Sequence, residues 1–121
     1  MVVLMRSVVV FALLLAGPAY AQENAHPSDR TIKVTAERYH FTPSKIKLKV
    51  GEAVVLVLTS LDTDHGFRIP HANINATIPP KGKGELRIRF RPTEKGKYWY
   101  ESSVPSGAGY SLMRGVIKVH D

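Results

Sequence analysis

The sequence predicts an all-β fold, a Greek-key sandwich or barrel of about eight short strands. Apolar residues recur at every second position in most segments after residue 31, which is the period of a half-buried strand. Clusters of Gly, Pro, Asp and Ser divide these segments at short intervals. No segment shows a clear amphipathic helical period. The length of 121 residues indicates one domain.

The first 21 residues are typical of a secretory signal peptide. An early Arg6 precedes an apolar run at residues 8–16, and a Gly-Pro pair leads to an Ala-Tyr-Ala cleavage pattern at residues 19–21. We therefore expect cleavage before Gln22 and a periplasmic or secreted protein without a stable membrane span. An uncleaved anchor is the alternative, although the run is shorter than the ~20 residues that span a bilayer.

Polar residues 22–30 are expected to form a flexible lead-in, followed by the domain at residues 31–121. The segment TIKVTAERYHF, which starts at Thr31, alternates apolar and polar side chains and predicts the first strand. In KIKLKV, three lysines alternate with Ile46, Leu48 and Val50. We expect these three apolar residues to point toward the core.

The middle of the chain contains the most apolar strand. AVVLVLTS, residues 53–60, is apolar and β-branched almost throughout, which predicts a central strand covered on both faces. FRI at residues 67–69 and INATI at residues 74–78 are two further short strands. Turn residues at 42–44, 51–52, 62–64 and 79–82 separate these segments from their neighbours.

Three strands complete the set. ELRIRF, residues 85–90, alternates apolar side chains with arginines, and GVIKVH closes the chain at residues 115–120. Between them, KYWYE carries three consecutive aromatic residues, Tyr98, Trp99 and Tyr100. At least one of these must point inward, because successive side chains of a strand point to opposite faces.

Charge and cysteine content restrict the functions that the chain can have. The formal charge is +7, and loss of Arg6 would leave an excess that favours an acidic partner protein. The Lys and Arg stripes are also explained by solubility and protection of sheet edges. They do not interleave with aromatic residues, so nucleic acid binding is not expected. Without cysteine there is no disulfide and no thiolate metal ligand.

A late loop, ESSVPSGAGYSLM, connects the last two predicted strands and has an unusual spacing. Ser102, Ser106, Tyr110 and Met113 follow one another at intervals of four, four and three residues. With the upstream His65 in DHGF, this frame resembles the cupredoxins of cytochrome c oxidase subunit two, nitrous-oxide reductase and small periplasmic relatives. The resemblance extends from about residue 31 to residue 120. It implies a cupredoxin-like fold and a copper site at this loop.

The loop departs from the family at the positions that hold copper most strongly. The resemblance implies Cys, Cys and His at three positions that carry oxygen donors here: Ser102, Ser106 and Tyr110. His65 and Met113 match the remaining side-chain ligands, and the family's carbonyl ligand would be that of Val104. Serine cannot replace the soft thiolate that bridges two copper ions, and a mononuclear blue site also needs Cys. Family-type electron transfer is therefore doubtful.

A weaker, single-copper site is the hypothesis that remains. The imidazole of His65 and the thioether of Met113 together suit Cu(I). A third donor is open between His71 and His40. Two oxygen donors, Tyr110 and Glu101, would suit Cu(II) or ferric iron if deprotonated. His26 in the lead-in and His120 near the chain end are not counted.

Structural explanations for the same residues remain open. His65 can form a hydrogen bond with a neighbouring backbone carbonyl, and Met113 can fill the core. Ser102, Ser106 and Tyr110 can form a hydrogen-bonded cluster in the vacated site. A hydrolytic triad around Asp64 and His65 is disfavoured, because adjacent residues of a strand point apart and no Gly-x-Ser-x-Gly elbow occurs. No catalytic residue is predicted, and we expect the protein not to be an enzyme.

Two functions of different class follow from the sequence. The first is copper storage, delivery or sensing through His65 and Met113, near an oxidase-like or copper-handling protein. The second is a metal-free interaction module that docks an acidic partner through its basic face or the reshaped loop. Electron transfer, which the family resemblance implies, is the third and least favoured function.

Overall fold

The computed structural model describes residues 29–105 and 107–121. The expected signal peptide and most of the lead-in lie outside these residues. The first strand begins at Arg30, one residue before the expected start of the domain. In the part of the chain that is described, no helix has the length and apolar character needed to cross a membrane.

The described residues contain nine strands and two short 3-10 helices. In chain order they are β1 (Arg30–Glu37), β2 (His40–Thr42), β3 (Lys45–Lys49), β4 (Val54–Ser60), β5 (His65–Ile69), η2 (Pro70–Ala72), β6 (Ile74–Ile78), β7 (Leu86–Phe90), β8 (Gly96–Glu101), η3 (Tyr110–Leu112) and β9 (Arg114–His120). The all-β prediction is confirmed. There is one strand more than expected, because the first predicted segment is broken at residues 38 and 39 into β1 and β2.

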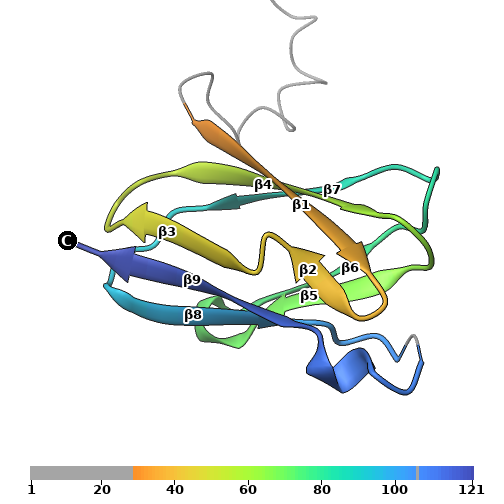
Figure 1. Cartoon of the computed structure of the whole chain (residues 1–121). Helices are drawn as coiled ribbons and strands as arrows, with labels where there is room; N and C mark the ends of the chain where they lie inside the picture. The colour runs from red at the N-terminus through yellow and green to blue at the C-terminus, as the bar shows by residue number, and fades with distance from the viewer. Residues whose placement is uncertain (1–28, 106) are drawn as a thin grey trace, which may run out of the picture.

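The strands form two sheets packed face to face, with strand orders β2-β1-β4-β7 and β3-β9-β8-β5-β6 (Figure 1). The fold is therefore a sandwich, and the barrel alternative is wrong because the sheets remain separate. Two pairs, β1 with β4 and β3 with β9, are parallel. Strand pairing in the sandwich is therefore mixed rather than entirely antiparallel, because each parallel pair joins strands that the chain connects by crossing to the other sheet.

The alternation read from the sequence determines the core. Val34 and Ala36 of β1, Ile46 and Leu48 of β3, and Phe90 of β7 are all buried between the sheets. Residues 54–58 of β4 are buried on both faces, as expected for the central strand. Val50 differs from the prediction: it lies in the turn after β3 and is exposed. The turn at residues 50–51 ends the alternation before Val50 can reach the core.

Aromatic rings pack in the core at the level of β2, β5 and β8. The ring centroids of Phe41, Phe67 and Tyr100 lie 5.3 to 6.0 Å apart. The Tyr100 hydroxyl donates a hydrogen bond to the carbonyl of Pro43 at 2.7 Å, and burial raises the pKa of this phenol. Its ring lies against Gly115 of β9, where a Cβ would overlap the ring.

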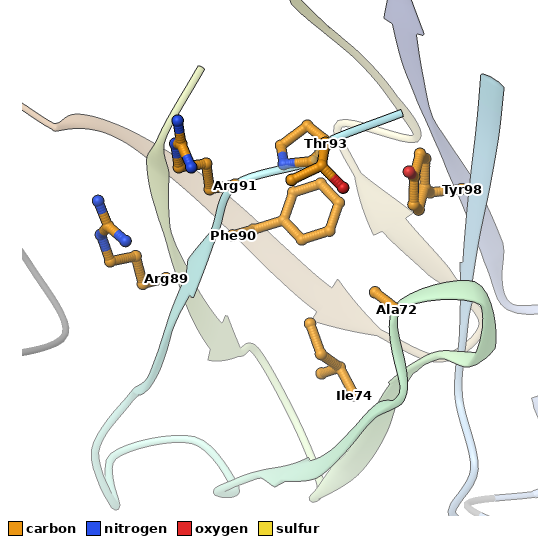
Figure 2. A pocket seen from close by; sticks show the side chains of 8 residues that line it. Ala72, Ile74, Arg89, Phe90, Arg91, Thr93 and Tyr98 are labelled. Atoms are coloured by element: carbon orange, nitrogen blue, oxygen red, sulfur yellow. The ribbon is translucent and has the colours of Figure 1, made fainter. Parts of the chain in front are cut away.

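The two ends of the sandwich differ. An open hollow of about 390 Å³ lies at the end where β7 finishes, with Phe90, Tyr98 and Ile74 among its lining residues (Figure 2). Phe90 pairs with Val54 at the start of β4, whereas His65 follows the end of β4. The hollow is therefore at the opposite end from the predicted copper ligands.

Candidate metal centre

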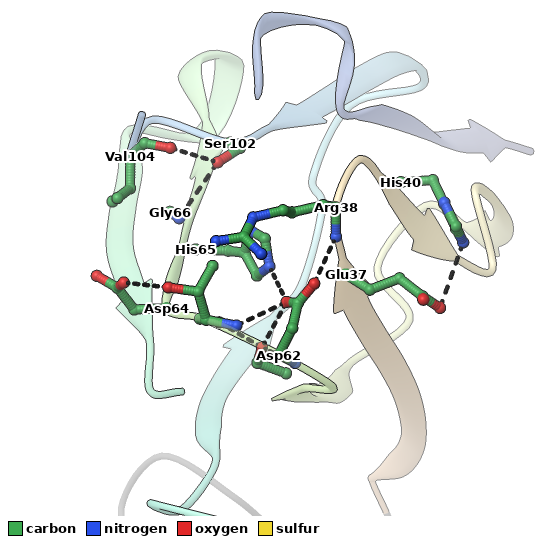
Figure 3. Close-up of polar contacts among 11 residues, drawn as sticks. Glu37, Arg38, His40, Asp62, Asp64, His65, Gly66, Ser102 and Val104 are labelled. Carbon is green, nitrogen blue, oxygen red and sulfur yellow. Dashed lines mark hydrogen bonds and ion pairs between the residues drawn. The ribbon is translucent and has the colours of Figure 1, made fainter. Parts of the chain in front are cut away.

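His65 is the first residue of β5, and its side chain is completely buried. The turn at residues 61–64 carries the chain from β4 in one sheet to β5 in the other. Within this turn, Asp62 points back at the imidazole, and its Oδ1 lies 2.7 Å from His65 Nε2 (Figure 3). From the sequence, only Asp64 was considered beside His65, and that pair was disfavoured; the carboxylate that contacts the imidazole belongs to Asp62, three residues before the histidine.

Asp62 is held in place by several donors. Its carboxylate accepts hydrogen bonds from the backbone N–H of Arg38 at 3.0 Å and of Thr63 at 2.8 Å. Burial alone would raise the pKa of Asp62. The hydrogen bonds from Arg38, His65 and Thr63 outweigh it and lower that pKa to about 2. The carboxylate is therefore charged near neutral pH and accepts the Nε2 proton of His65.

The other imidazole nitrogen of His65 has no hydrogen-bond partner among the described residues. Nδ1 is buried and forms no hydrogen bond to any of the residues that the structure describes. With the proton on Nε2, Nδ1 carries a lone pair. A buried acceptor without a hydrogen bond is costly and rare in folded proteins. Nδ1 thus has a lone pair that no described residue uses, and it belongs to the histidine at which the family resemblance places a copper ligand.

Ser102, at the first vacated cysteine position, is buried next to β5. Its hydroxyl accepts a hydrogen bond from the N–H of Gly66 at 3.3 Å and donates one to the carbonyl of Val104 at 3.4 Å (Figure 3). Gly66 is needed here because a Cβ at this position would overlap the backbone nitrogen and hydroxyl of Ser103. The Ser102 hydroxyl and the Val104 carbonyl are therefore hydrogen-bonded to each other.

Met113 immediately precedes β9 and is completely buried in the core. Its carbonyl accepts a hydrogen bond from the N–H of Ser102 at 3.3 Å. The hydrogen bonds of Ser102 therefore connect Met113 on one side with Gly66, the neighbour of His65, on the other. The fold brings the two matching positions, His65 and Met113, to the same end of the sandwich.

The structure does not bring His71 to this end. His71 lies in η2, beyond the far end of β5, so at ~3.3 Å per residue the strand separates it from His65 by more than 10 Å. Its ring stacks on Tyr98 with centroids 4.6 Å apart. His40 is at the correct end but is exposed, and its Nε2 lies 3.4 Å from a carboxylate oxygen of Glu37.

The remaining predicted oxygen donors are engaged or undescribed. Glu101 is bound by Arg68, whose Nε lies 3.1 Å from a carboxylate oxygen, on the outward face of the sheet. Tyr110 opens η3. The side chain of Tyr110 and the whole of Ser106 lie outside the described residues, so the predicted cluster of Ser102, Ser106 and Tyr110 stays a prediction.

Tyr39 is a second residue at this end that the sequence prediction did not identify. Its ring fills the space in front of Gly107 and Gly109 of the late loop, where a Cβ at either glycine would overlap it. Gly107 also has φ of +149°, which favours glycine. The Gly-Ala-Gly segment of the loop thus accommodates an aromatic ring from the β1–β2 turn.

The side chains present do not fit a dinuclear thiolate centre. The orphaned Nδ1 of His65 and the buried thioether of Met113 are both ligands that suit Cu(I). Among the described residues, no three His, Asp or Glu side chains are grouped so that they could jointly hold a metal. The chain has no cysteine to bridge two copper ions.

Comparisons with known proteins agree with this architecture. The family model of the cupredoxin-like domain matches residues 7–117. Cytochrome c oxidase subunit 2 of Thermus thermophilus is 30% identical over 106 residues, which cover 88% of this chain and 77% of that protein.

Two solved structures share the fold. The periplasmic domain of subunit II of cytochrome oxidase from Bradyrhizobium japonicum has a TM-score of 0.68 at 17% identity, and the match covers 77% of this chain and 85% of that one. The metal-binding domain of the Cu(I)-exporting P-type ATPase of Streptococcus pneumoniae, solved with Cu(I), has a TM-score of 0.61 at 20% identity over 80% and 91% of the two chains. Sequence and fold together show that the chain belongs to the cupredoxin-like domain family.

Proposed function

We propose that this protein binds a single cuprous ion outside the cytoplasm, in copper storage, delivery or sensing. The observation that carries the proposal is the unpartnered Nδ1 of His65, buried at the family's ligand position. Met113 would supply a thioether as the second donor, and a third donor would come from the late loop or from the bound partner. The predicted signal peptide would deliver the domain to that compartment.

The residues around the site would have separate tasks. Asp62 would hold a proton on Nε2 and fix the orientation of the ring, so that Nδ1 of His65 would be the nitrogen that faces an ion. Burial of Met113 keeps the thioether away from water, and a soft, dry donor pair favours Cu(I) over harder cations. Copper bound in this way would be available for transfer, because the site contains no thiolate that would retain it.

The test measures Cu(I) affinity and stoichiometry by competition with a chromophoric chelator under anaerobic conditions. The wild-type chain is expected to bind about one ion, and His65→Ala to abolish binding, because a two-donor site cannot lose its imidazole. Met113→Leu preserves core volume while removing the sulfur, and is expected to weaken binding by at least tenfold. His71→Ala and His40→Ala serve as matched histidine controls.

Two results would contradict the proposal. Wild-type protein that retains no more copper than His65→Ala would remove the metal role altogether. A thermal melt gives an independent measurement, since an ion at 100 times its dissociation constant stabilises the fold by ~2.7 kcal/mol. An intensely coloured, reversibly reducible copper form would instead favour electron transfer.

A further inference from the structure

The outward face of the five-stranded sheet collects basic side chains from four strands. Seven cations and one carboxylate, Glu101, are carried there. The cations, which we call the basic face, are Lys45, Lys47 and Lys49 of β3, Arg68 of β5, Lys97 of β8, and Arg114 and Lys118 of β9. Their strand neighbours are mostly buried, and the cross-strand register places all seven on the same side of the sheet.

Three of these lysines stand in one row across the sheet. Lys47 pairs with Lys118, and Lys118 pairs with Lys97, in registered positions of β3, β9 and β8. Like charges directly opposite one another destabilise a sheet. None of the ion pairs between described residues involves these three lysines. The row therefore carries uncompensated positive charge.

Protection of sheet edges explains only part of the row. Lysines on an edge strand prevent pairing with another chain, and β3 is an edge strand of its sheet. Lys118 and Lys97 lie on β9 and β8, which are paired on both sides. Their charges protect no edge, so edge protection does not explain why they adjoin Lys47.

An exposed aromatic residue lies beside the row. Trp99 is 42% exposed, and the guanidinium of Arg114 lies 4.5 Å from the centroid of its ring. A shallow groove of about 250 Å³ runs along this ring. Its lining residues are Pro70, His71, Lys97, Trp99, Glu101 and Arg114. The groove thus combines the apolar side chains of Pro70 and Trp99 with the cations of Lys97 and Arg114.

The face already binds one carboxylate from its own sheet. Glu101 stands opposite Arg68 on one side and Arg114 on the other, and Arg68 contacts it through two guanidinium nitrogens. Guanidinium groups recognise carboxylates with a geometry that an ammonium lacks. Two arginines, an aromatic ring and the lysine row thus form one continuous surface suited to side-chain carboxylates.

We infer that the basic face docks an acidic segment of a partner protein. A bilayer fits less well, because of the five most exposed large apolar side chains in the described residues only Trp99 lies on this face. Nucleic acid binding would use several stacked aromatic residues, and the face offers one. An acidic peptide strand uses the whole surface, since carboxylates spaced along it can meet the lysine row while one side chain enters the groove. The inference is independent of copper.

Trp99 reports directly on the face, because it is the only tryptophan of the chain. The probe is a polyglutamate peptide of about ten residues, which spans ~33 Å when extended and exceeds the ~19 Å width of a five-stranded sheet. Titration into the full chain at low salt is expected to change Trp99 fluorescence saturably. Addition of 0.15 M salt should weaken binding, as screening requires.

Matched triple variants identify the face. Lys47→Gln/Lys97→Gln/Lys118→Gln is expected to weaken peptide binding at least about tenfold, and the corresponding Lys→Arg triple to restore it. The control Lys33→Gln/Lys81→Gln/Lys83→Gln removes the same charge from exposed positions elsewhere and is expected to change the affinity less than about twofold. The row variant should melt no lower than wild type, because it relieves like-charge contacts.

Three outcomes would overturn the inference. The first is the absence of saturable binding by the wild-type chain. The second is an equal loss of peptide affinity in both Gln triple variants, which would mean that the peptide is attracted by the net charge of the protein alone. The third is row-dependent binding to vesicles of phosphatidylglycerol and phosphatidylcholine without binding of the peptide, which would identify the face as a membrane contact.

Discussion

Nε2 of His65 and Oδ1 of Asp62 lie 2.7 Å apart across the turn between β4 and β5. This contact connects the fold to the proposed copper site. The carboxylate, itself held by backbone N–H groups of residues 38 and 63, orients the ring through Nε2, and Nδ1 has no hydrogen bond to the described residues. A histidine with both nitrogens engaged would have no atom left for an ion. The orphaned nitrogen therefore results from how the turn is built.

Replacement of Asp62 should weaken copper binding without removing a ligand. We expect Asp62→Asn to lower Cu(I) affinity about 10- to 100-fold, since loss of a carboxylate behind a ligating histidine typically has this effect. Chelator competition measures it. Asp64→Asn is the control, because the Asp64 carboxylate accepts a hydrogen bond from the Thr63 hydroxyl, whereas the imidazole of His65 is bonded to Asp62. Equal losses in the two variants would mean that the contact with His65 has no role.

The same carboxylate should make stability depend on acid. Its folded pKa of about 2 is below the usual value of 3.8, so its stabilisation is present above pH 3.8 and is lost as the pH falls through 2. With the side chain still 30% exposed, about 1–2 kcal/mol is expected at pH 7. In urea unfolding measured from pH 7 to pH 2, the unfolding free energies of the wild type and of Asp62→Asn should converge as the pH falls. A gap that does not change with pH would contradict this assignment.

Local patterns in the sequence predicted much of the fold because alternation is a local property. Ile46 and Leu48, or Val34 and Ala36, reveal a buried face without knowledge of the partner strand. Pairing is not local: nothing in these residues indicates that β3 joins β9 in parallel. The break at residues 38 and 39 was also missed, since the polar residues there fit a continuing strand equally well.

The candidate site was predictable in its frame but not in its contacts. The spacing pointed to residues that hydrogen bonds do connect, since Ser102 bonds to Gly66 beside His65 and to the carbonyl of Met113, but their role as ligands stays a prediction. The role of Asp62 depends on how a turn folds back, which spacing alone does not reveal. His71 was considered as a ligand because its segment adjoins one that flanks the metal end in the family, yet β5 carries it to the opposite end.

Gly66 should control the position of the loop over the site. A Cβ there overlaps the backbone nitrogen of Ser103, so Gly66→Ala must displace residues 102–104. We expect a loss of about 1–3 kcal/mol in unfolding free energy, typical of overpacking, together with weaker Cu(I) binding. Gly115→Ala, where the new Cβ overlaps the Tyr100 ring and not the loop, is the control for destabilisation alone. Unchanged copper affinity in a destabilised Gly66→Ala variant would separate this loop from the site.

The Tyr100 hydroxyl should contribute to stability through a single hydrogen bond. Tyr100→Phe keeps the ring between Phe41 and Phe67 but leaves the Pro43 carbonyl without its donor. A cost of about 1–2 kcal/mol is expected, since an unmade hydrogen bond at a buried site costs this much. Denaturant unfolding measures it. A neutral result would mean that water replaces the hydroxyl at Pro43.

Tyr39 and Gly109 should be coupled energetically, because the ring occupies the space that a side chain at residue 109 would need. Gly109→Ala alone is expected to cost about 1–3 kcal/mol through overlap with the ring. In a Tyr39→Ala background the space is free, and the same substitution should be nearly neutral. A double-mutant cycle from unfolding measurements should therefore give a coupling of about 0.5–3 kcal/mol. Additive losses would mean that the loop does not pack on Tyr39 in solution, and the Gly-Ala-Gly segment would then need another explanation.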